Sequence, residues 1–194
     1  MSTATFGGTP TEIAALVGQD AADWLAAEFA KPATSYLDRV IPLITQRLNE
    51  PFNARATRPV HSDMFWEAAI SGDDQLRQRA LFALSQIVVV GEFNLNRSHQ
   101  HAAYMDALYL NAFGNYRDLL DDITYNPSMG DYLTYRGSQR ANPNTGRLPD
   151  ENYAREILQL FTIGLIELNM DGTPELRNGQ TVETFDNDDI VNLS

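Results

Sequence analysis

Residues 73–90, with the sequence DDQLRQRALFALSQIVVV, are the strongest candidate for a core helix. Apolar residues recur there at the three- and four-residue spacing of a helix. Leu81 and Phe82 make the segment apolar nearly all round, which is typical of a buried helix. The end of the segment, Val88 to Val90, also fits a short strand, and periodicity does not decide between the two. The residues with helical spacing are Leu76, Ala80, Ala83, Leu84, Ile87 and Val88.

Two arginines, Arg77 and Arg79, lie on this predicted core helix. A buried guanidinium needs a partner, because an isolated charge is costly to remove from water. The candidate partners are the acidic residues Asp73, Asp74 and Glu156.

The rest of the chain is also predicted to be helical. Thr9, Pro10 and Glu12 have the pattern of a capping box with proline in the first turn. Pro42 falls inside an apolar stripe and predicts a kink or a split in that helix. Further helices are predicted from Asp20 to Lys31, 36–49, 64–70, 102–113, around 116–123, 127–133 and 151–163.

Turn signals become frequent after residue 164. Asp171-Gly172 and Asn178-Gly179 are turn dipeptides, and short strands fit between them. The predicted fold is mainly α: an irregular multi-helix bundle with a small β-hairpin near residues 166–185. Residues 1–194 are expected to form a single helical domain. The last predicted helix, capped by Asp186, presents an apolar stripe at the chain end, so we expect a truncated N-terminal part of a longer domain.

Composition excludes several classes of function. The 14 Lys and Arg residues against 26 Asp and Glu residues give a formal net charge of -12, with no basic run. Nucleic acid and anionic membranes attract proteins through clustered positive charge, so neither is expected as a partner. The chain has no cysteine, which excludes thiol catalysis and disulfides. No apolar run approaches the ~18 residues of a membrane span. The first residues lack the basic and apolar regions of a signal peptide.

The residues that stand out chemically lie on the predicted helix 151–163. Asn152, Arg155, Glu156 and Gln159 have the spacing i, i+3, i+4, i+7, which predicts one shared polar face. Arg155 offers a rigid fork for a carboxylate or phosphate, and Glu156 could act as a base or a hard-metal ligand. On the pattern alone, a solvated helix face is the more frequent explanation. A structural ion pair between Glu151 and Arg155 is a third interpretation.

Several blocks of sequence carry a family resemblance. They are NYRDLL (115–120), NPSMGDYL (126–133) and ENYAREILQLFTIG (151–164), with weaker matches at 4–7, 74–79 and 83–86. Together they make the chain resemble the bacterial domain-of-unknown-function family 1800 over nearly its whole length. The resemblance implies a longer protein and a location outside the cytoplasm, periplasmic or extracellular. It identifies neither a reaction nor a cofactor. It makes a functional site on the face of Asn152, Arg155 and Glu156 about as probable as a structural network.

Two functional hypotheses follow. In the first, an exported enzyme-like domain uses Glu156 and Arg155 as catalytic residues. Asn152, Gln159 and Arg117 bind the substrate. In the second, a non-catalytic binding or scaffold domain of the cell envelope uses the same residues as a structural network. Whether the protein is an enzyme stays open, and the expected partner is the remainder of its own domain beyond Ser194.

Other candidate sites are weaker. His99 and His101 point apart on a helix, and His61 stands alone in the sequence, so no metal site is predicted. Residues 169–173, NMDGT, resemble part of a calcium loop but lack its full ligand spacing and its terminal glutamate. We interpret this segment as a turn.

Overall fold

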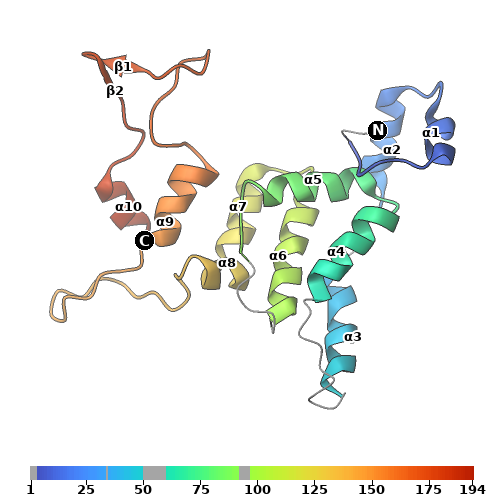
Figure 1. Cartoon of the computed structure of the whole chain (residues 1–194). Helices are drawn as coiled ribbons and strands as arrows, with labels where there is room; N and C mark the ends of the chain where they lie inside the picture. The colour runs from blue at the N-terminus through green and yellow to red at the C-terminus, as the bar shows by residue number, and fades with distance from the viewer. Residues whose placement is uncertain (1–3, 34, 50–59, 92–96) are drawn as a thin grey trace. The chain divides into compact units, whose positions relative to one another are not determined.

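The computed structural model (Figure 1) describes residues 4–33, 35–49, 60–91 and 97–194. Within these residues the protein is mainly α-helical, with a small two-stranded antiparallel sheet, which confirms the predicted fold class. The chain divides into two compact units, Met1–Ser128 and Met129–Ser194. That residues 1–194 form a single domain stays a prediction.

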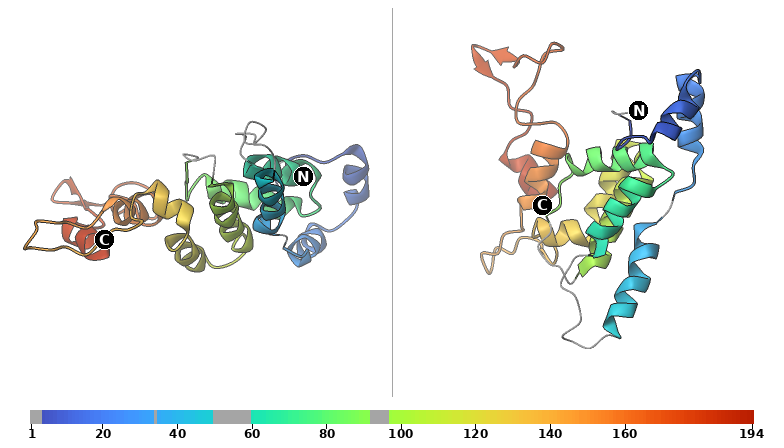
Figure 2. Two further views of the ribbon diagram at one scale, coloured as in Figure 1. Left: turned by 90° about the horizontal axis from the view of Figure 1, so that it is seen from below. Right: turned by 45° about the vertical axis from the view of Figure 1, so that its right-hand side comes forward.

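The first unit contains a cluster of packed helices. Its α3, α4 and α6 contact one another, and α5 packs against α4 and α6 (Figures 1 and 2). The bounds are α1 Pro10–Leu16, α2 Ala21–Ala30, α3 Tyr36–Leu48, α4 Val60–Ser71, α5 Gln75–Ser85, α6 Ser98–Leu110 and α7 Tyr116–Thr124, while α8, Pro127–Tyr132, begins in this unit.

Local signals correctly predicted several helix ends. Thr9 and Glu12 form the expected capping box at α1, and the Asp20 side chain accepts from the Ala22 N–H at the start of α2. Pro42 does not split its helix, because α3 continues through it to Leu48. The missing proline N–H removes one hydrogen bond, but packing of α3 against α4 and α6 supports the rest.

The predicted core helix 73–90 is shorter and less buried than expected. It ends as α5 at Ser85, and only Gln78 and Leu81 are buried on it. Ile87 is 48% exposed, whereas Val88 is fully buried and its carbonyl oxygen accepts a 2.6 Å hydrogen bond from the Tyr104 hydroxyl. Residues 88–90 belong to no strand. Apolar composition alone therefore overestimated the burial of this segment.

A single carboxylate joins α6 to the start of α3. Asp106 accepts the Tyr36 N–H at 2.5 Å, the Leu37 N–H at 3.1 Å and the Ser35 hydroxyl at 2.7 Å. The first N–H groups of a helix have no partner within the helix. Asp106 supplies a hydrogen-bond acceptor for these N–H groups from a different helix. Its negative charge is also favourable at a helix N-terminus. This interaction fixes where α3 begins relative to α6.

A buried polar network connects the same helices to α5. The Tyr36 hydroxyl donates to the Gln78 side-chain oxygen, and the Gln78 amide donates to Asp74. The Tyr109 hydroxyl also donates to Asp74, and the Tyr36 and Tyr109 rings meet edge to face at 6.0 Å. Burial, reinforced by the Asp74 charge, raises the pKa of Tyr36. The network satisfies polar groups that would otherwise be costly to bury.

The arginines of α5 pack against aromatic rings, not against the acids predicted from the sequence. The Arg77 guanidinium lies 4.7 Å from the Phe113 ring centre, and it donates to the Tyr109 carbonyl oxygen at 3.3 Å. The Arg79 guanidinium lies 5.3 Å from the Phe6 ring centre and 5.5 Å from that of Phe82. Ring faces attract cations, so aromatic rings, and not the predicted carboxylates, lie against the guanidinium groups of these two arginines.

The second unit carries the hairpin. It comprises the rest of α8, then α9 Asn152–Glu156, a π-helical turn at Ile157–Phe161, β1 Leu176–Arg177, β2 Gln180–Thr181 and α10 Asn187–Leu193. Asn178 and Gly179 join the strands, and both have positive φ, at 55° and 81°. Positive φ at both central residues defines the hairpin turn that Asn-Gly favours. Asp186 and Asp189 form a capping box at α10, which contacts α9.

We predict that Asp106→Ala lowers the free energy of unfolding of the first unit by about 1–3 kcal/mol, because it leaves the first N–H groups of α3 without their charged acceptor. Urea unfolding followed by circular dichroism measures the change. Asp121→Asn is the matched control, since Asp121 is exposed on α7, and we expect a change within about 0.5 kcal/mol. Equal effects of the two substitutions would contradict the role of Asp106.

Candidate functional site

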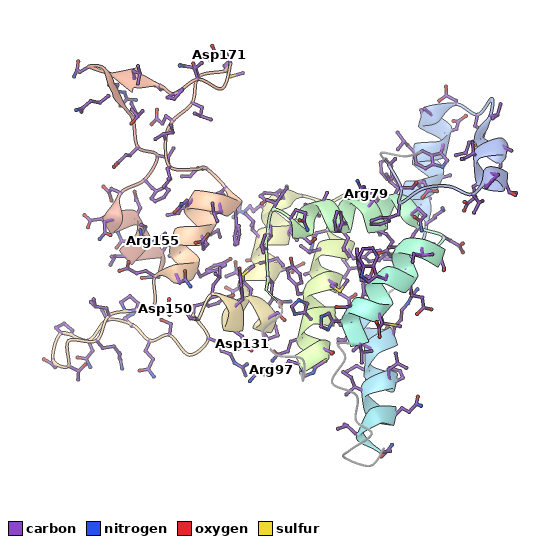
Figure 3. The ribbon with its side chains drawn as sticks, viewed as in Figure 1. Arg79, Arg97, Asp131, Asp150, Arg155 and Asp171 are labelled. Atoms are coloured by element: carbon purple, nitrogen blue, oxygen red, sulfur yellow. The ribbon has the colours of Figure 1, made fainter. Side chains whose placement is uncertain are left out.

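Three of the predicted site residues lie on α9. Asn152 and Arg155 are exposed there, and Glu156 is half-buried at the end of the helix. Figure 3 shows Arg155 on α9, with Asp150 just before the helix begins. The spacing of these three residues is α-helical, so they share one side of α9. Gln159 is half-buried and lies beyond α9, in the π-helical turn.

The π-helical turn changes the geometry expected for Gln159. Its hydrogen bonds span five residues, as from the Ile163 N–H to the Leu158 carbonyl oxygen at 3.2 Å. The Thr162 hydroxyl also donates to the Ile157 carbonyl oxygen at 2.5 Å. A wider turn rotates the following side chains away from their α-helical positions, so the i, i+7 relation does not place Gln159 above Asn152. Turns of this kind are rare and occur frequently at functional sites.

The Arg155 guanidinium forms an exposed ion pair. Its Nη2 lies 3.1 Å from the Glu151 carboxylate, and the two side chains are 46% and 30% exposed. This is the i, i+4 pair that the sequence predicted as one interpretation of the face. Exposed helical pairs of this kind contribute only about 0.3–0.5 kcal/mol. The pair therefore orients Arg155 without holding it strongly.

Asp150 joins the start of α9 to Thr134 and Ser138, which precede it in the chain. Its carboxylate accepts the Asn152 N–H at 2.9 Å and the Thr134 hydroxyl at 2.7 Å. Its own N–H donates to the Ser138 hydroxyl at 2.9 Å. Residues 134 and 150 are thus joined across the intervening loop, and the polar face of α9 begins at this junction.

The opposite side of α9 supplies the packing of this unit. Tyr153 and Ala154 are buried, as is Phe161 in the π-helical turn. The Tyr153 ring lies 4.5 Å from the Tyr135 ring, centre to centre, and burial raises the pKa of Tyr135. This apolar contact leaves the Asn152 and Arg155 side exposed to solvent.

Arg117, the remaining predicted substrate-binding residue, lies in the other unit. It is exposed near the start of α7, where its backbone N–H donates to the Asn115 side chain that caps the helix. Its membership of one site with the α9 residues stays a prediction.

The structure brings together two histidines that the sequence treated separately. The ring centres of His61 on α4 and His101 on α6 are 4.4 Å apart, and both residues line a cavity of about 480 Å³ with Trp66 and Phe82. Burial lowers the pKa of His61, and the charge of Asp63 opposes that shift. Among the described residues no group of three or more His, Asp or Glu side chains is placed to hold a metal ion.

The segment resembling a calcium loop is a hydrogen-bonded turn. The Gly172 N–H donates to the Asn169 carbonyl oxygen at 2.9 Å, and Asp171 accepts from both the backbone and the hydroxyl of Thr173. These bonds, the Thr173 hydroxyl first, lower the pKa of Asp171. The carboxylate thus serves the turn, as the sequence predicted.

Two acidic side chains with important contacts were missed by the sequence analysis. Asp106 caps a helix about seventy positions away, and Glu28 is buried on α2 in contact with Lys31. The only sequence signal for Glu28 is a lysine three positions later, which is common on helices. For Asp106 the sequence has no local signal.

The chain is thus a mainly α-helical protein whose most distinctive segment, the ENYARE run, forms α9 and leads into a π-helical turn. The family model described as "Protein of unknown function (DUF1800)" matches residues 1–194. The chain therefore belongs to the DUF1800 family, as the resemblance predicted. No curated protein and no solved structure matched it in the corresponding searches. In the part of the chain that the structure describes, no helix is long and apolar enough to cross a bilayer.

We predict that stability falls as the pH is lowered through about 6.5, the ordinary pKa of histidine. The pKa of His61 is lowered in the folded protein, so the unfolded chain binds more protons below that pH. The stability contributed by neutral His61 is fully present above pH 6.5. It is lost as the pH falls towards the pKa that His61 has in the folded protein. The melting temperature between pH 8 and pH 5 measures the effect.

His61→Phe should flatten this pH dependence, because a neutral ring replaces the titrating one. His99→Gln is the control, since His99 is exposed, and it should leave the dependence unchanged. A pH profile that is the same in His61→Phe as in the parent protein would contradict the assignment.

Proposed function

We propose that the exposed side of α9 binds the anionic group of a small polar substrate and that the protein is an exported enzyme-like domain. Arg155 acts as the clamp for a carboxylate or phosphate, and Glu156 acts as the acid or base. Asn152 and Gln159 orient the substrate. This proposal depends mainly on the exposure of Arg155, whose guanidinium pairs, among the described residues, with the Glu151 carboxylate alone.

The exposure of Asn152 and Arg155 to solvent favours this proposal over a purely structural role for the same residues. A network that fixes helix packing works through buried, mutually paired polar groups. Asn152 and Arg155 are instead exposed, and the packing of this unit uses Tyr153, Ala154 and Phe161. The solvent exposure of these two side chains is what a ligand-binding surface requires.

The energetics of the Arg155 pair also favour ligand binding. An exposed ion pair is worth about 0.3–0.5 kcal/mol, whereas charge-assisted hydrogen bonds to a well-placed anion are worth about 1.5–3 kcal/mol. An incoming carboxylate or phosphate therefore replaces Glu151 at a small cost. The planar guanidinium can then bind two oxygens at once.

The half-buried position of Glu156 suits proton transfer at the same place. It directly follows Arg155 and ends α9, and the π-helical turn begins at the next residue. Glu156 lies one helical turn beyond Asn152, on the side of α9 that we propose meets the substrate. The π-helical turn supports a functional role, because such turns are concentrated at functional sites.

The alternative function is a non-catalytic binding or scaffold domain of the cell envelope. Apolar side chains exposed after α9 favour it: Leu160 is 61% exposed, Ile163 55% and Leu165 54%. Contiguous exposed apolar surface marks interaction sites.

We predict that Arg155→Ala weakens the binding of inorganic phosphate or citrate by about 10- to 100-fold, the factor that corresponds to about 1.5–3 kcal/mol. Isothermal titration calorimetry at low ionic strength measures it. Arg177→Ala is the matched control, because Arg177 is an exposed arginine of the same unit that also pairs with carboxylates. If both variants bind as the parent does, or both lose the same affinity, Arg155 is not the clamp.

We also predict that Glu156→Gln changes the free energy of unfolding by less than about 0.5 kcal/mol, as expected for a partly exposed side chain. Urea unfolding of the purified chain measures it. A structural network would give a loss of about 2 kcal/mol or more through unpaired buried groups. That larger loss would favour the scaffold alternative.

A further inference from the structure

The cavity of about 480 Å³ beside His61 and His101 is within the size range of small-molecule sites. It is lined by residues of α4, α5 and α6 and of the segment that follows α5. Among the described residues that line it, none is Asp, Glu, Lys or Arg. A charged ligand would lose its hydration there without gaining an opposite charge. The cavity therefore suits a neutral ligand.

Aromatic side chains form one wall of this cavity. Phe65 and Trp66 of α4 and Phe82 of α5 contribute to it. The Phe65 and Phe82 rings stack with their centres 6.1 Å apart, and the Trp66 ring meets Phe65 edge to face at 5.2 Å. Pairs of aromatic rings attract each other more strongly than the buried area alone explains. The wall therefore favours a ligand with a flat aromatic ring.

The walls of the cavity are held in place by contacts within the protein. The Phe6 ring lies 5.9 Å from that of Phe82 and 6.1 Å from that of Phe65, so three rings support one another. The Tyr104 hydroxyl, from α6, donates to the Val88 carbonyl oxygen at 2.6 Å. A preformed site has less to order when a ligand binds, which lowers the free-energy cost of binding.

Two apolar side chains of the lining are accessible to solvent. Trp66 is 56% exposed and Val89 is 41% exposed. Tryptophan is highly buried on average in folded proteins, and exposed tryptophan is enriched where proteins meet other molecules. A ligand can therefore contact the Trp66 ring directly and cover its exposed surface.

The surroundings of the aromatic wall disfavour a cationic ligand. Aromatic faces attract cations in general, but the Arg79 guanidinium already lies 5.5 Å from the Phe82 ring centre. Its positive charge repels a second cation. The neutral side chains of Ser62 and Gln86 also line the cavity and can bond to a hydroxyl or ring N–H of a ligand.

We propose that this cavity binds a small, neutral, planar aromatic molecule that carries a hydroxyl or N–H group and stacks against Trp66. All the residues that carry the proposal belong to the first unit, so it does not depend on the function proposed for α9. The site requires no chemistry beyond reversible binding.

Proton–nitrogen correlation spectra of the whole chain test the proposal with 2-naphthol, a neutral aromatic alcohol, at about pH 7.5, above the ordinary pKa of histidine. Trp24 and Trp66 are the two tryptophans of the chain, and Trp24→Phe assigns their indole N–H signals. We expect the Trp66 signal to shift and saturate with a millimolar or tighter dissociation constant, while the Trp24 signal stays in place. No saturable shift of the Trp66 signal, or equal shifts of both signals, would overturn the proposal.

Relatives of 2-naphthol test the chemical class of the ligand. Decahydro-2-naphthol keeps the carbon skeleton without the aromatic rings and should bind about three- to tenfold more weakly. The anion naphthalene-2-sulfonate and the cation 2-naphthylmethylammonium should each bind more weakly by about tenfold or more, because neither meets an opposite charge. Equal or tighter binding of any of the three would overturn the proposal.

Trp66→Leu tests the aromatic wall at a position exposed enough for the fold to tolerate the change, which far-ultraviolet circular dichroism verifies. Calorimetry should show 2-naphthol binding weakened by about three- to tenfold. Trp24→Leu is the matched control, because Trp24 does not line this cavity, and its binding should equal that of the parent. Parent-like binding in Trp66→Leu, or equal losses in the two variants, would overturn the proposal.

Discussion

The first unit depends on the carboxylate of Asp106. This side chain of α6 holds the first turn of α3 through two backbone N–H groups and the Ser35 hydroxyl. Because α3 and α6 have the most extensive mutual packing of the described helices, the position of Tyr36 and its bond to Gln78 follow from that anchor. The polar network reaching Asp74 and Tyr109 then places α5, whose C-terminal half lines the cavity beside His61 and His101. One charged cap thus determines the arrangement on which the buried polar groups rely.

Local features of the fold were predictable from the sequence, since they depend on neighbouring residues. The capping box at Thr9, the helix cap at Asp186 and the Asn178-Gly179 hairpin turn occur where the residues indicate. Long-range features were not predictable. Asp106 and Tyr36 are separated by seventy positions, and no periodicity relates them. The prediction that residues 73–90 are buried nearly all round was also wrong, because apolar composition does not show which side of a helix packs against another helix.

The candidate site was likewise predictable from the sequence only in part. Sequence spacing correctly grouped Asn152, Arg155 and Glu156 on one helix and predicted the Glu151 pair as one interpretation. It did not predict the π-helical turn that contains Gln159, because an apolar run such as 157–161 has no residue that marks a wider turn. Membership of the DUF1800 family supplies no chemistry.

Nitrogen-detected NMR of the arginine side chains tests the central claim most directly, because it reports on the guanidinium of Arg155 itself. On addition of phosphate, the claim requires the Arg155 resonance to shift and saturate while that of Arg177 stays in place, as Glu151 is replaced by the anion. A resonance of Arg155 that does not respond, or that moves in parallel with Arg177, would show that the exposed side of α9 is ordinary solvated surface.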